Sequence, residues 1–389
     1  AERLDTFKRW YSQAGTPRVA ARGHWDAGAR TYTLHLSQTC PPSPGQPDKD
    51  PFVIPVEVGL LSRDGVAVPL VLDGQPRGLN HLLVLDGAEA SWTFEGIDAE
   101  PVPSLLRGFS APVILSFDYT DAQLLVMLAH DPDPFNRWEA AQRLTLQRAL
   151  NFIRGTGQPG ESRILDAACV DALRAVLRHP GLDPAFKELV LTLPSETYLS
   201  EQLDVVDPQR VHAVRESMRE QLAIDLLHDW QWAWERHGDT GAYRPDPLSS
   251  GRRALSGLAL TMLCLAARAT GDVVWPGKAY QRFKDAGNMT DRFNALSALV
   301  SAGHALAEPA LARFHAMFQD EALVLDKWFA LQAGATDRGG QVLPAVRLLL
   351  QHPDFSLRNP NRARSLIFSY CSANPGGFHR PDAAGYVFW

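Results

Sequence analysis

The chain has 389 residues, 45% of them hydrophobic and 21% charged, which is the ordinary composition of a folded globular protein. Its net charge of −6 argues against nucleic acid or an anionic membrane as a partner, because binding phosphates requires a basic surface. The length exceeds what one compact core usually serves, so we expect two or three domains. The most apolar window, residues 255–267, is shorter than the roughly 18 apolar residues that a membrane span needs.

Both ends of the sequence predict an interrupted structure. The first residues read AERLDTFKRWYSQ, without an initiator methionine or a signal peptide. The spacing of Leu4, Phe7 and Tyr11 predicts the last turns of a helix. The last residues read GYVFW, an apolar run that is unfavourable to leave in water. We therefore expect the chain to be a piece of a longer polypeptide.

Residues 16–119 have the pattern of a β domain. Apolar and polar side chains alternate over residues 32–37 and 54–60, which is the period of a half-buried strand. Pro55 suggests that the second of these strands lies at a sheet edge. Turn sequences follow or separate further apolar runs, with SRDG at 62–65, LDG at 72–74 and LDG again at 85–87.

The remaining apolar runs of this region complete the expectation for its fold. Strands are predicted over residues 91–94 and 113–117, whereas the proline-rich segment 40–51 can only be a loop. About seven short strands separated by turns predict an antiparallel β-sandwich of immunoglobulin-like type.

From residue 120 the hydrophobic period changes to 3.6, which predicts helices. Asp-Pro pairs at 183–184 and 207–208 are typical helix starts, with aspartate as the N-cap and proline at the first helical position. A single long helix is predicted over 207–237, and Thr290 is the candidate N-cap of a later one.

No fixed repeat period is present in this helical region, so it is not a regular repeat array. About a dozen helices with short connections nevertheless fit an irregular α-solenoid of HEAT or armadillo type, in which each helix pair packs only on its neighbours. Such arrays form concave surfaces. The predicted fold class is therefore α+β multidomain, a sandwich followed by an all-α superhelix.

Sequence motifs for catalysis are absent. None of the 12 histidines is followed by glutamate, so the zinc-protease motif H-E-x-x-H does not occur. The sequence also lacks a G-x-S-x-G elbow and a Walker loop, and no G-x-G-x-x-G follows a predicted strand. The four cysteines, at positions 40, 169, 264 and 371, have no metal-ligand spacing, which favours buried reduced thiols in a cytosolic protein.

Two other kinds of candidate site have structural interpretations that we favour. Histidine and aspartate are neighbours at 24–26, 130–133 and 228–230, but adjacent side chains point to different faces and do not form a ready metal pair. In DWQWAWERH (229–237), Trp230 and Trp234 share a helix face that favours core packing over an aromatic box for a ligand.

The most polar stretch of the helical region is NPNRARSLIFSYCSANPGGFH, residues 359–379. Pro360 suits the start of a helix, and the asparagine, proline and glycines at 374–377 suit its end. Arg362 and Arg364 are two positions apart, so they face different directions. Two interpretations are open: an arginine that bridges helix ends at a corner, or an arginine on a concave surface that binds a carboxylate or a peptide carbonyl.

Four strings of the sequence carry a resemblance to a known family. They are FKRWYSQAGTPRV (7–19), GNMTDRFNALSAL (287–299), LVLDKWFALQA (323–333) and SLRNPNRARSLIFSYCSANPGGFH (356–379). Together they resemble bacterial aminopeptidase N, a family of zinc-dependent gluzincin aminopeptidases. The matches follow the family's order over nearly the whole chain, although none of them is a catalytic motif.

The resemblance implies a domain layout. Residues 1–15 would be the tail of the catalytic domain, residues 16–119 the β-sandwich connector, and residues 120–389 the C-terminal α-solenoid, truncated at its C-terminus. The family's zinc ligands and catalytic residues precede this segment, so none is expected here. In the family the second arginine of the NPNR-x-RSL string lines the substrate cavity, which implies substrate binding for Arg364 and leaves Arg362 with a structural role.

The expected function is that of the C-terminal part of a zinc metallo-aminopeptidase, which removes N-terminal amino acids from peptides. This part would cap the active site, limit substrate access and be inactive alone. We expect zinc in the whole enzyme and none in this chain, peptide substrates bound through the missing catalytic domain, and a cytoplasmic monomer. The alternative is an independent, non-enzymatic scaffold that binds a peptide or a protein.

Overall fold

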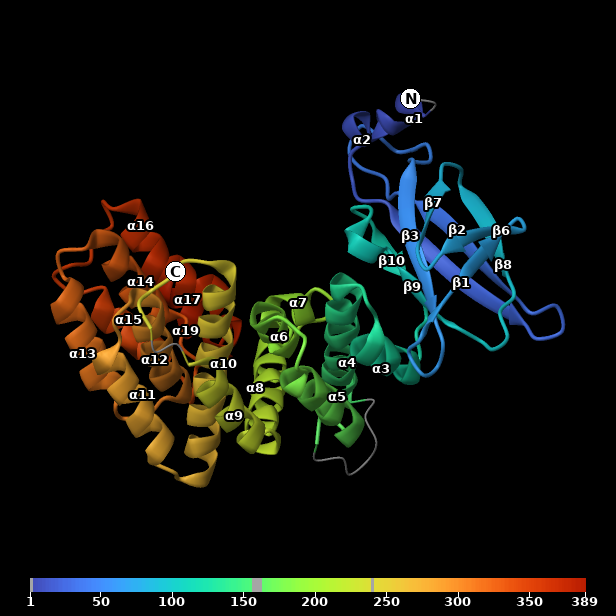
Figure 1. Cartoon of the computed structure of the whole chain (residues 1–389). Coiled ribbons are helices and arrows are strands. Elements are labelled where there is room, and N and C mark those ends of the chain that lie inside the picture. Colours follow the sequence, from blue (N-terminus) through green and yellow to red (C-terminus); the bar gives the residue numbers. More distant parts are fainter. Residues whose placement is uncertain (1–2, 156–162, 239–240) are drawn as a thin grey trace. The chain divides into compact units, whose positions relative to one another are not determined.

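The structure is a computed structural model that describes residues 3–155, 163–238 and 241–389. The chain divides into two compact units, Ala1–Leu144, which contains the strands, and Thr145–Trp389, which is helical (Figure 1). The division falls within helix α4 (Pro134–Arg154). The domain boundaries expected from the sequence stay predictions.

The N-terminal unit is a sandwich of two sheets that follows the short helices α1 (Leu4–Phe7) and α2 (Arg9–Ser12). One sheet has the strand order β10-β1-β2-β8-β5-β6, and in the other β3 pairs with β4, β7 and β9. The strands are β1 (Arg18–Asp26), β2 (Thr31–Thr39), β3 (Ile54–Leu61), β4 (Ala67–Val68), β5 (Leu70–Leu72), β6 (Gln75–Gly78), β7 (His81–Leu85), β8 (Glu89–Glu95), β9 (Val102–Leu105) and β10 (Ile114–Ser116).

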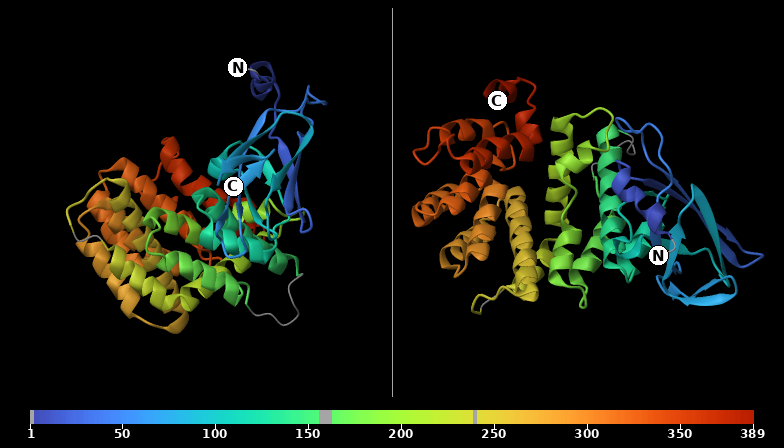
Figure 2. Two further views of the ribbon diagram at one scale, coloured as in Figure 1. Left: turned by 45° about the vertical axis from the view of Figure 1, so that its right-hand side comes forward. Right: turned by 90° about the horizontal axis from the view of Figure 1, so that it is seen from above.

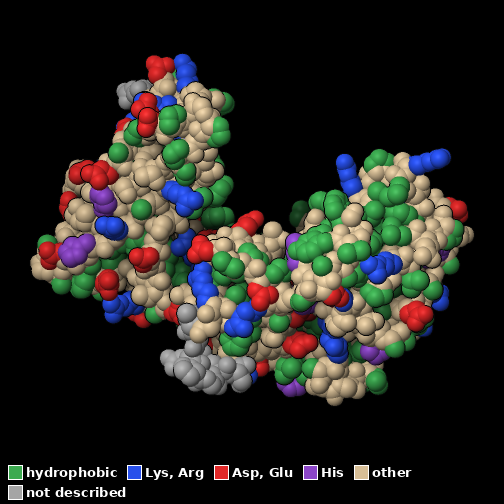
Figure 3. Space-filling view, turned by 180° about the vertical axis from the view of Figure 1, so that it is seen from behind, with side chains coloured by type: hydrophobic (Ala, Val, Ile, Leu, Met, Phe, Trp, Pro, Cys, Tyr) green, Lys and Arg blue, Asp and Glu red, His purple; other side chains and the backbone are tan. Residues whose placement is uncertain are grey.

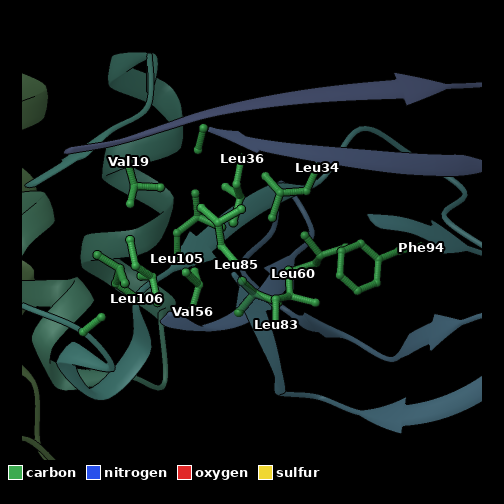
Figure 4. Close-up of a cluster of buried hydrophobic side chains, with 14 of the residues drawn as sticks. Val19, Leu34, Leu36, Val56, Leu60, Leu83, Leu85, Phe94, Leu105 and Leu106 are labelled. Carbon is green, nitrogen blue, oxygen red and sulfur yellow. The ribbon is translucent and has the colours of Figure 1, made fainter. Parts of the chain in front are cut away.

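The core of the sandwich lies between the two sheets. Alternate residues of β2 are buried, as the sequence predicted, and Leu34 and Leu36 point toward Leu83 and Leu85 of the other sheet (Figure 4). Asp73 and Gly74 form the turn between β5 and β6 with positive φ angles of 54° and 67°, which confirms this hairpin. The immunoglobulin-like fold expected from the sequence is confirmed.

Two expectations for the strands were wrong. β3 is an interior strand, because Val58 pairs with His81 of β7 on one side and with Leu105 of β9 on the other. Proline has no N–H to donate, but at Pro55 β3 is paired with β7 alone, because the pairing with β9 begins only at Val58. The sandwich is also not wholly antiparallel, since β10 pairs in parallel with β1.

The 3-10 helix η1 (Arg107–Phe109) lies between β9 and β10, and helix α3 (Asp121–His130) follows the sandwich and precedes α4. The remaining helices are α5 (Ala167–Arg178), α6 (Pro184–Leu191), α7 (Glu196–Ser200), α8 (Pro208–Asp225), α9 (Leu227–His237), α10 (Pro247–Thr270), α11 (Val274–Asp285), α12 (Met289–Ala302), α13 (Ala307–Phe318), α14 (Ala322–Ala333), α15 (Val342–Leu349), α16 (Pro360–Ala363), the π-helix η2 (Arg364–Phe368), α17 (Ser369–Ala373), α18 (Pro375–Phe378) and α19 (Ala384–Phe388).

The helices of the C-terminal unit form the expected irregular array. They follow one another through the unit in chain order, and successive helices such as α9, α10, α11 and α12 pack on each other (Figure 2). Asp183 and Asp207 cap α6 and α8 as predicted, each with proline at the first helical position. The α-solenoid expectation is confirmed.

Two details of this array differ from the sequence prediction. The long helix expected over 207–237 is broken at Leu226, whose φ of −108° and ψ of 21° separate α8 from α9. Asn288, not Thr290, caps α12, because the Asn288 side chain accepts a hydrogen bond from the Asp291 amide at 2.9 Å while Thr290 lies inside the helix.

The structure also bears on the expectations for surface charge, membrane spans and cysteines. On the face shown in Figure 3, lysine and arginine are interspersed with acidic side chains, so its described residues form no continuous basic surface. In the described part of the chain, every helix is too short or too polar to cross a membrane. The four cysteines are free; Cys169 and Cys264 are buried as predicted, but Cys40 and Cys371 are only half-buried.

Candidate functional site

The candidate site is the segment 359–379, which begins with a capped helix. Asn359 has an extended backbone, and its side-chain oxygen accepts hydrogen bonds from the amides of Asn361 at 3.0 Å and Arg362 at 3.3 Å. Pro360 occupies the first helical position, where its missing N–H costs nothing. This confirms the predicted helix start.

Arg362 points into the helical unit and joins three parts of it. The Arg362 side chain is 6% exposed, and its Nε donates to Asp326 Oδ1 of α14 at 2.6 Å. Its two Nη groups donate to the carbonyls of Asp354 and Ala322, and its guanidinium lies 5.1 Å from the Phe329 ring. Arg362 therefore bridges neighbouring helices and the turn after α15, which agrees with the structural role expected for it from the sequence.

The end of the segment explains its asparagine and its glycines. The Asn374 amide nitrogen donates to Ala335 O at 2.7 Å, and its oxygen accepts from the Gly377 amide at 3.2 Å. A Cβ at Gly376 would lie 2.9 Å from the Cβ of His212 in α8, so this position admits no side chain without a shift. These residues make a tight corner against α8.

Arg364 faces the other way, as the spacing predicted. It begins the π-helix η2, and such widened turns occur frequently at functional sites. The Arg364 side chain is exposed, and within the described part of the chain its guanidinium has no hydrogen-bonded or ionic partner. It is the only charged side chain among the described residues that line a hollow of about 480 Å³, which Leu350, Leu357, Ala363, Ile367, Phe368, Phe388 and Trp389 complete.

This arrangement favours the binding of an anionic or carbonyl group. An unpaired guanidinium at the rim of an apolar hollow can donate two parallel hydrogen bonds to a carboxylate, or one to a peptide carbonyl. Such bonds are stronger where apolar side chains reduce competition from water. The role of Arg364 in substrate binding stays a prediction.

The structure also brings together three residues that the sequence analysis did not single out. His315 of α13 and the pair His352 and Asp354, which follow α15, place one potential metal ligand each within 4.8 Å of the others. The separation of 37 positions between His315 and His352 hides this proximity in the sequence. Only the histidine and aspartate at i and i+2 could have indicated it.

These three residues do not fit the catalytic zinc that the resemblance implies for the whole enzyme. His315 Nε2 and Asp354 Oδ2 already form a hydrogen bond of 2.6 Å, and His352 Nδ1 accepts from the Asp354 amide at 3.2 Å. Burial lowers the pKa of His352, His315 and the Arg362 guanidinium act in the same direction, and Asp354 opposes them. The positive charge of Arg362 against the same turn works against binding a cation. We therefore assign the trio to the packing of α13 against the turn after α15.

The other predicted candidates have structural partners. Asp131 is buried and lies 3.3 Å from an Arg107 Nη, in an ion pair beneath the sandwich. Asp229 pairs with Arg174 and Arg178 of α5. Trp230 is fully buried and donates to Leu222 O at 3.0 Å, which confirms the core interpretation for this residue.

Comparisons with known proteins place both parts of the chain. Residues 121–389 match the family model "Domain of unknown function (DUF3458_C) ARM repeats", and residues 15–118 match "Domain of unknown function (DUF3458) Ig-like fold". Among solved structures, the chain is similar to the aminopeptidase A of Legionella pneumophila in complex with aspartic acid, with a TM-score of 0.82 and 27% identity over 99% of this chain and 43% of that chain.

Curated relatives are similar over the whole of this chain. Aminopeptidase N of Escherichia coli is 36% identical over 385 residues, and aminopeptidase N of Caulobacter vibrioides is 39% identical over 391 residues. Each alignment covers 99% of this chain, which spans 43% and 42% of those two relatives. The chain therefore belongs to the family defined by the Ig-like DUF3458 domain followed by the ARM-repeat DUF3458_C domain, and it is homologous to the C-terminal part of aminopeptidase N.

Proposed function

We propose that this chain serves as the C-terminal part of a zinc metallo-aminopeptidase that removes N-terminal amino acids from peptides. The observation that carries the proposal is the similarity to aminopeptidase N of Escherichia coli, at 36% identity over 99% of this chain. In the whole enzyme, zinc would lower the pKa of a water molecule and polarise the scissile carbonyl. The residues of this chain would bind and orient the peptide and restrict its access.

The arrangement of the site supports a role for this chain in binding the peptide, with catalysis left to the rest of the enzyme. The sequence contains no H-E-x-x-H motif, and the described histidine trio does not suit a catalytic zinc. Arg364, by contrast, is unpaired at an apolar hollow, where its charge can hold a peptide carbonyl or carboxylate. We propose that the chain caps the active site of a cytoplasmic, monomeric enzyme and is inactive alone.

The inactivity of the isolated chain can be measured directly. Incubation with an aminoacyl-p-nitroanilide should release no p-nitroaniline above the uncatalysed rate, because the chain lacks a metal-activated nucleophile. Elemental analysis of the dialysed protein should find no stoichiometric zinc. Turnover together with bound zinc would overturn the proposed division.

The role of Arg364 is tested in the whole enzyme that contains this chain. Arg364→Ala should raise KM for a tripeptide by about ten-fold, the loss expected for one charge-assisted hydrogen bond, with a smaller change in the melting temperature. Arg347→Ala is the matched control, because Arg347 is also an exposed arginine of this unit but lies outside the hollow. Unchanged kinetics with a lowered melting temperature would assign Arg364 a structural role instead.

The independent scaffold remains the second candidate, and the apolar hollow beside Arg364 is the observation that favours it. The mass of the native polypeptide in its source cell separates the two candidates. An aminopeptidase predicts a polypeptide about the length of the curated relatives, whereas a scaffold predicts a mass near 42.9 kDa.

A further inference from the structure

A second cavity lies inside the helical unit, and its wall is charged. It has a volume of about 380 Å³ and is lined by residues of α6, α7, α8, α10, α12, α14 and α17 and of the loops between them. Five of the residues that line it are titratable. Glu196 lies on α7, and the other four lie on α8: His212, Arg215, Glu216 and Arg219. This cavity is distinct from the hollow beside Arg364, because the two share no residue.

The charges around Glu216 do not balance. Glu216 Oε1 accepts from Arg219 Nη1 at 2.7 Å and lies 3.6 Å from Arg215 Nη1. Glu216 Oε2 lies 3.7 Å from Arg338 Nη2, too far for a hydrogen bond. Three guanidiniums therefore surround the Glu216 carboxylate.

The second carboxylate of the cavity, Glu196, offsets part of this excess, because it attracts Arg215 as well as His212. Glu196 Oε1 lies 2.8 Å from His212 Nδ1, and this hydrogen bond raises the pKa of His212. The three guanidiniums of Arg215, Arg219 and Arg338 against the two carboxylates of Glu196 and Glu216 leave an excess of one positive charge at the cavity.

Burial makes this excess unfavourable without an anion. The side chains of Arg215, Arg219 and Arg338 are only 21%, 14% and 22% exposed, so water solvates them incompletely. Burial lowers the pKa of Arg215 and of Arg338, neighbouring arginines act in the same direction, and the nearby carboxylates oppose both effects.

The guanidiniums also differ in how many donors they have left. Arg219 uses its Nη groups on Glu216 and on Ser301 Oγ, the latter at 2.9 Å. Arg215 donates its Nε to Pro194 O at 2.8 Å, but its Nη groups make no hydrogen bond within the described residues. Arg338 Nη2 is buried without a hydrogen-bond partner. Arg215, which lines the cavity, is therefore the guanidinium poised to donate to a ligand.

We propose that this cavity binds the carboxylate group of a small organic acid, with the Nη groups of Arg215 as its donors and the charge of Arg338 as support. A carboxylate fits better than a phosphate dianion, because it matches the planar guanidinium and brings only one negative charge close to Glu216. The other walls carry the hydroxyls of Thr261 and Ser297 and the apolar side chains of Met262 and Leu331, which suit a short amino-acid or peptide chain. The carboxylate can belong to a free amino acid or to the C-terminus of a short peptide.

The test uses the present chain and three probes in isothermal titration calorimetry at matched ionic strength. N-acetyl-trialanine carries a free carboxylate, its C-terminal amide lacks the charge, and alanine is the free amino acid. The free acid should bind saturably with one site per chain and at least about ten-fold more tightly than the amide, the ratio expected for a charge-assisted pair. Binding of alanine as tightly as the peptide assigns the site to free amino acids, and weaker binding assigns it to peptide ends.

Variants locate the binding in this cavity. Arg215→Gln should weaken binding of the free acid by about ten-fold, and Arg215→Lys should restore part of it, because the charge is kept and the fork is lost. Arg338→Gln is the second variant should Arg215→Gln fail to fold, and Arg347→Gln, at an exposed arginine outside the cavity, is the matched control.

Three results overturn the proposal. One is equal affinity for the free acid and its amide, and another is no saturable binding of either. The third is loss of binding in Arg364→Gln but not in Arg215→Gln, since this places the carboxylate in the other hollow. None of these results bears on the aminopeptidase assignment, which the kinetic measurements test separately.

Discussion

Arg362 and Arg364 show how two identical side chains acquire different roles from one helical turn. Arg362 is held by Asp326 and by two backbone carbonyls, so its charge is fully used inside the fold. Arg364 begins the π-helix η2 and keeps its donors free at the rim of a hollow. Two positions on a helix differ by about 200°, which is why one arginine faces the interior while the other faces solvent.

The structural role of Arg362 predicts a large loss of stability on its removal. Arg362→Ala leaves Asp326, which is 12% exposed, without its ionic partner, and this should cost about 3–5 kcal/mol of unfolding free energy. Arg364→Ala is the matched control two positions away and should change the unfolding free energy by less than about 0.5 kcal/mol. Urea unfolding followed by circular dichroism measures both values, and similar losses in the two variants would contradict the assignment.

At the scale of secondary-structure elements, the packing of α7 against α8 depends on protonation. The Glu196 side chain of α7 raises the pKa of His212 of α8 above its ordinary value of 6.5, against the opposing effect of burial. Because the pKa of His212 is higher in the folded state, protonation of His212 contributes to the free energy of unfolding. This contribution is complete below pH 6.5 and is lost as the pH rises through the folded-state pKa. Glu216 also faces His212 and acts in the same direction.

The corresponding experiment compares stability at two pH values. Between about pH 6 and about pH 8 the wild-type chain should lose more unfolding free energy than Glu196→Gln, because the variant lacks the carboxylate that holds the proton. Urea titrations of both proteins at each pH give the two differences. Equal losses in the two proteins would show that this pair does not govern the pH dependence.

Two glycines in different elements predict opposite effects of the same substitution. A Cβ at Gly59 of β3 would lie 2.1 Å from the buried Arg107 guanidinium, so Gly59→Ala should destabilise the chain by more than about 2 kcal/mol. Gly277 lies within helix α11 with no atom within 4 Å of an added Cβ, so Gly277→Ala should stabilise it by about 0.5–1 kcal/mol. Thermal melts of the two variants measure these changes in stability. An unchanged melting temperature for Gly59→Ala would mean that the Arg107 side chain can move aside.

At the scale of the whole molecule, the chain consists of two compact units with separate cores. Leu60 of the sandwich and Leu299 of α12 are both buried, and replacing either by alanine should cost about 2–5 kcal/mol. Differential scanning calorimetry should resolve two transitions, with Leu60→Ala lowering one and Leu299→Ala lowering the other. A single transition that both variants shift would show that the units unfold together.

Much of the fold could be read from local patterns. The alternation in β2 and the Asp-Pro starts of α6 and α8 determined strand and helix correctly, because they depend on neighbours within a few residues. Predictions that needed a distant partner failed: Pro55 marks a strand start inside the sheet, and the long helix expected over 207–237 breaks at Leu226. The position of β3 in its sheet and the break at Leu226 depend on which other strands and helices pack against these segments.

The sequence by itself determined the sandwich, the helical array and, through its resemblance, the family. It also determined that Arg362 and Arg364 point apart, since helical geometry alone decides that. Only the tertiary structure decided that Arg362 meets Asp326, that His315 meets Asp354, and that Arg215 and Arg338 share a single Glu216. The reason is physical: ion pairing and burial act between side chains that folding brings within a few ångströms, and sequence separation carries no record of that distance.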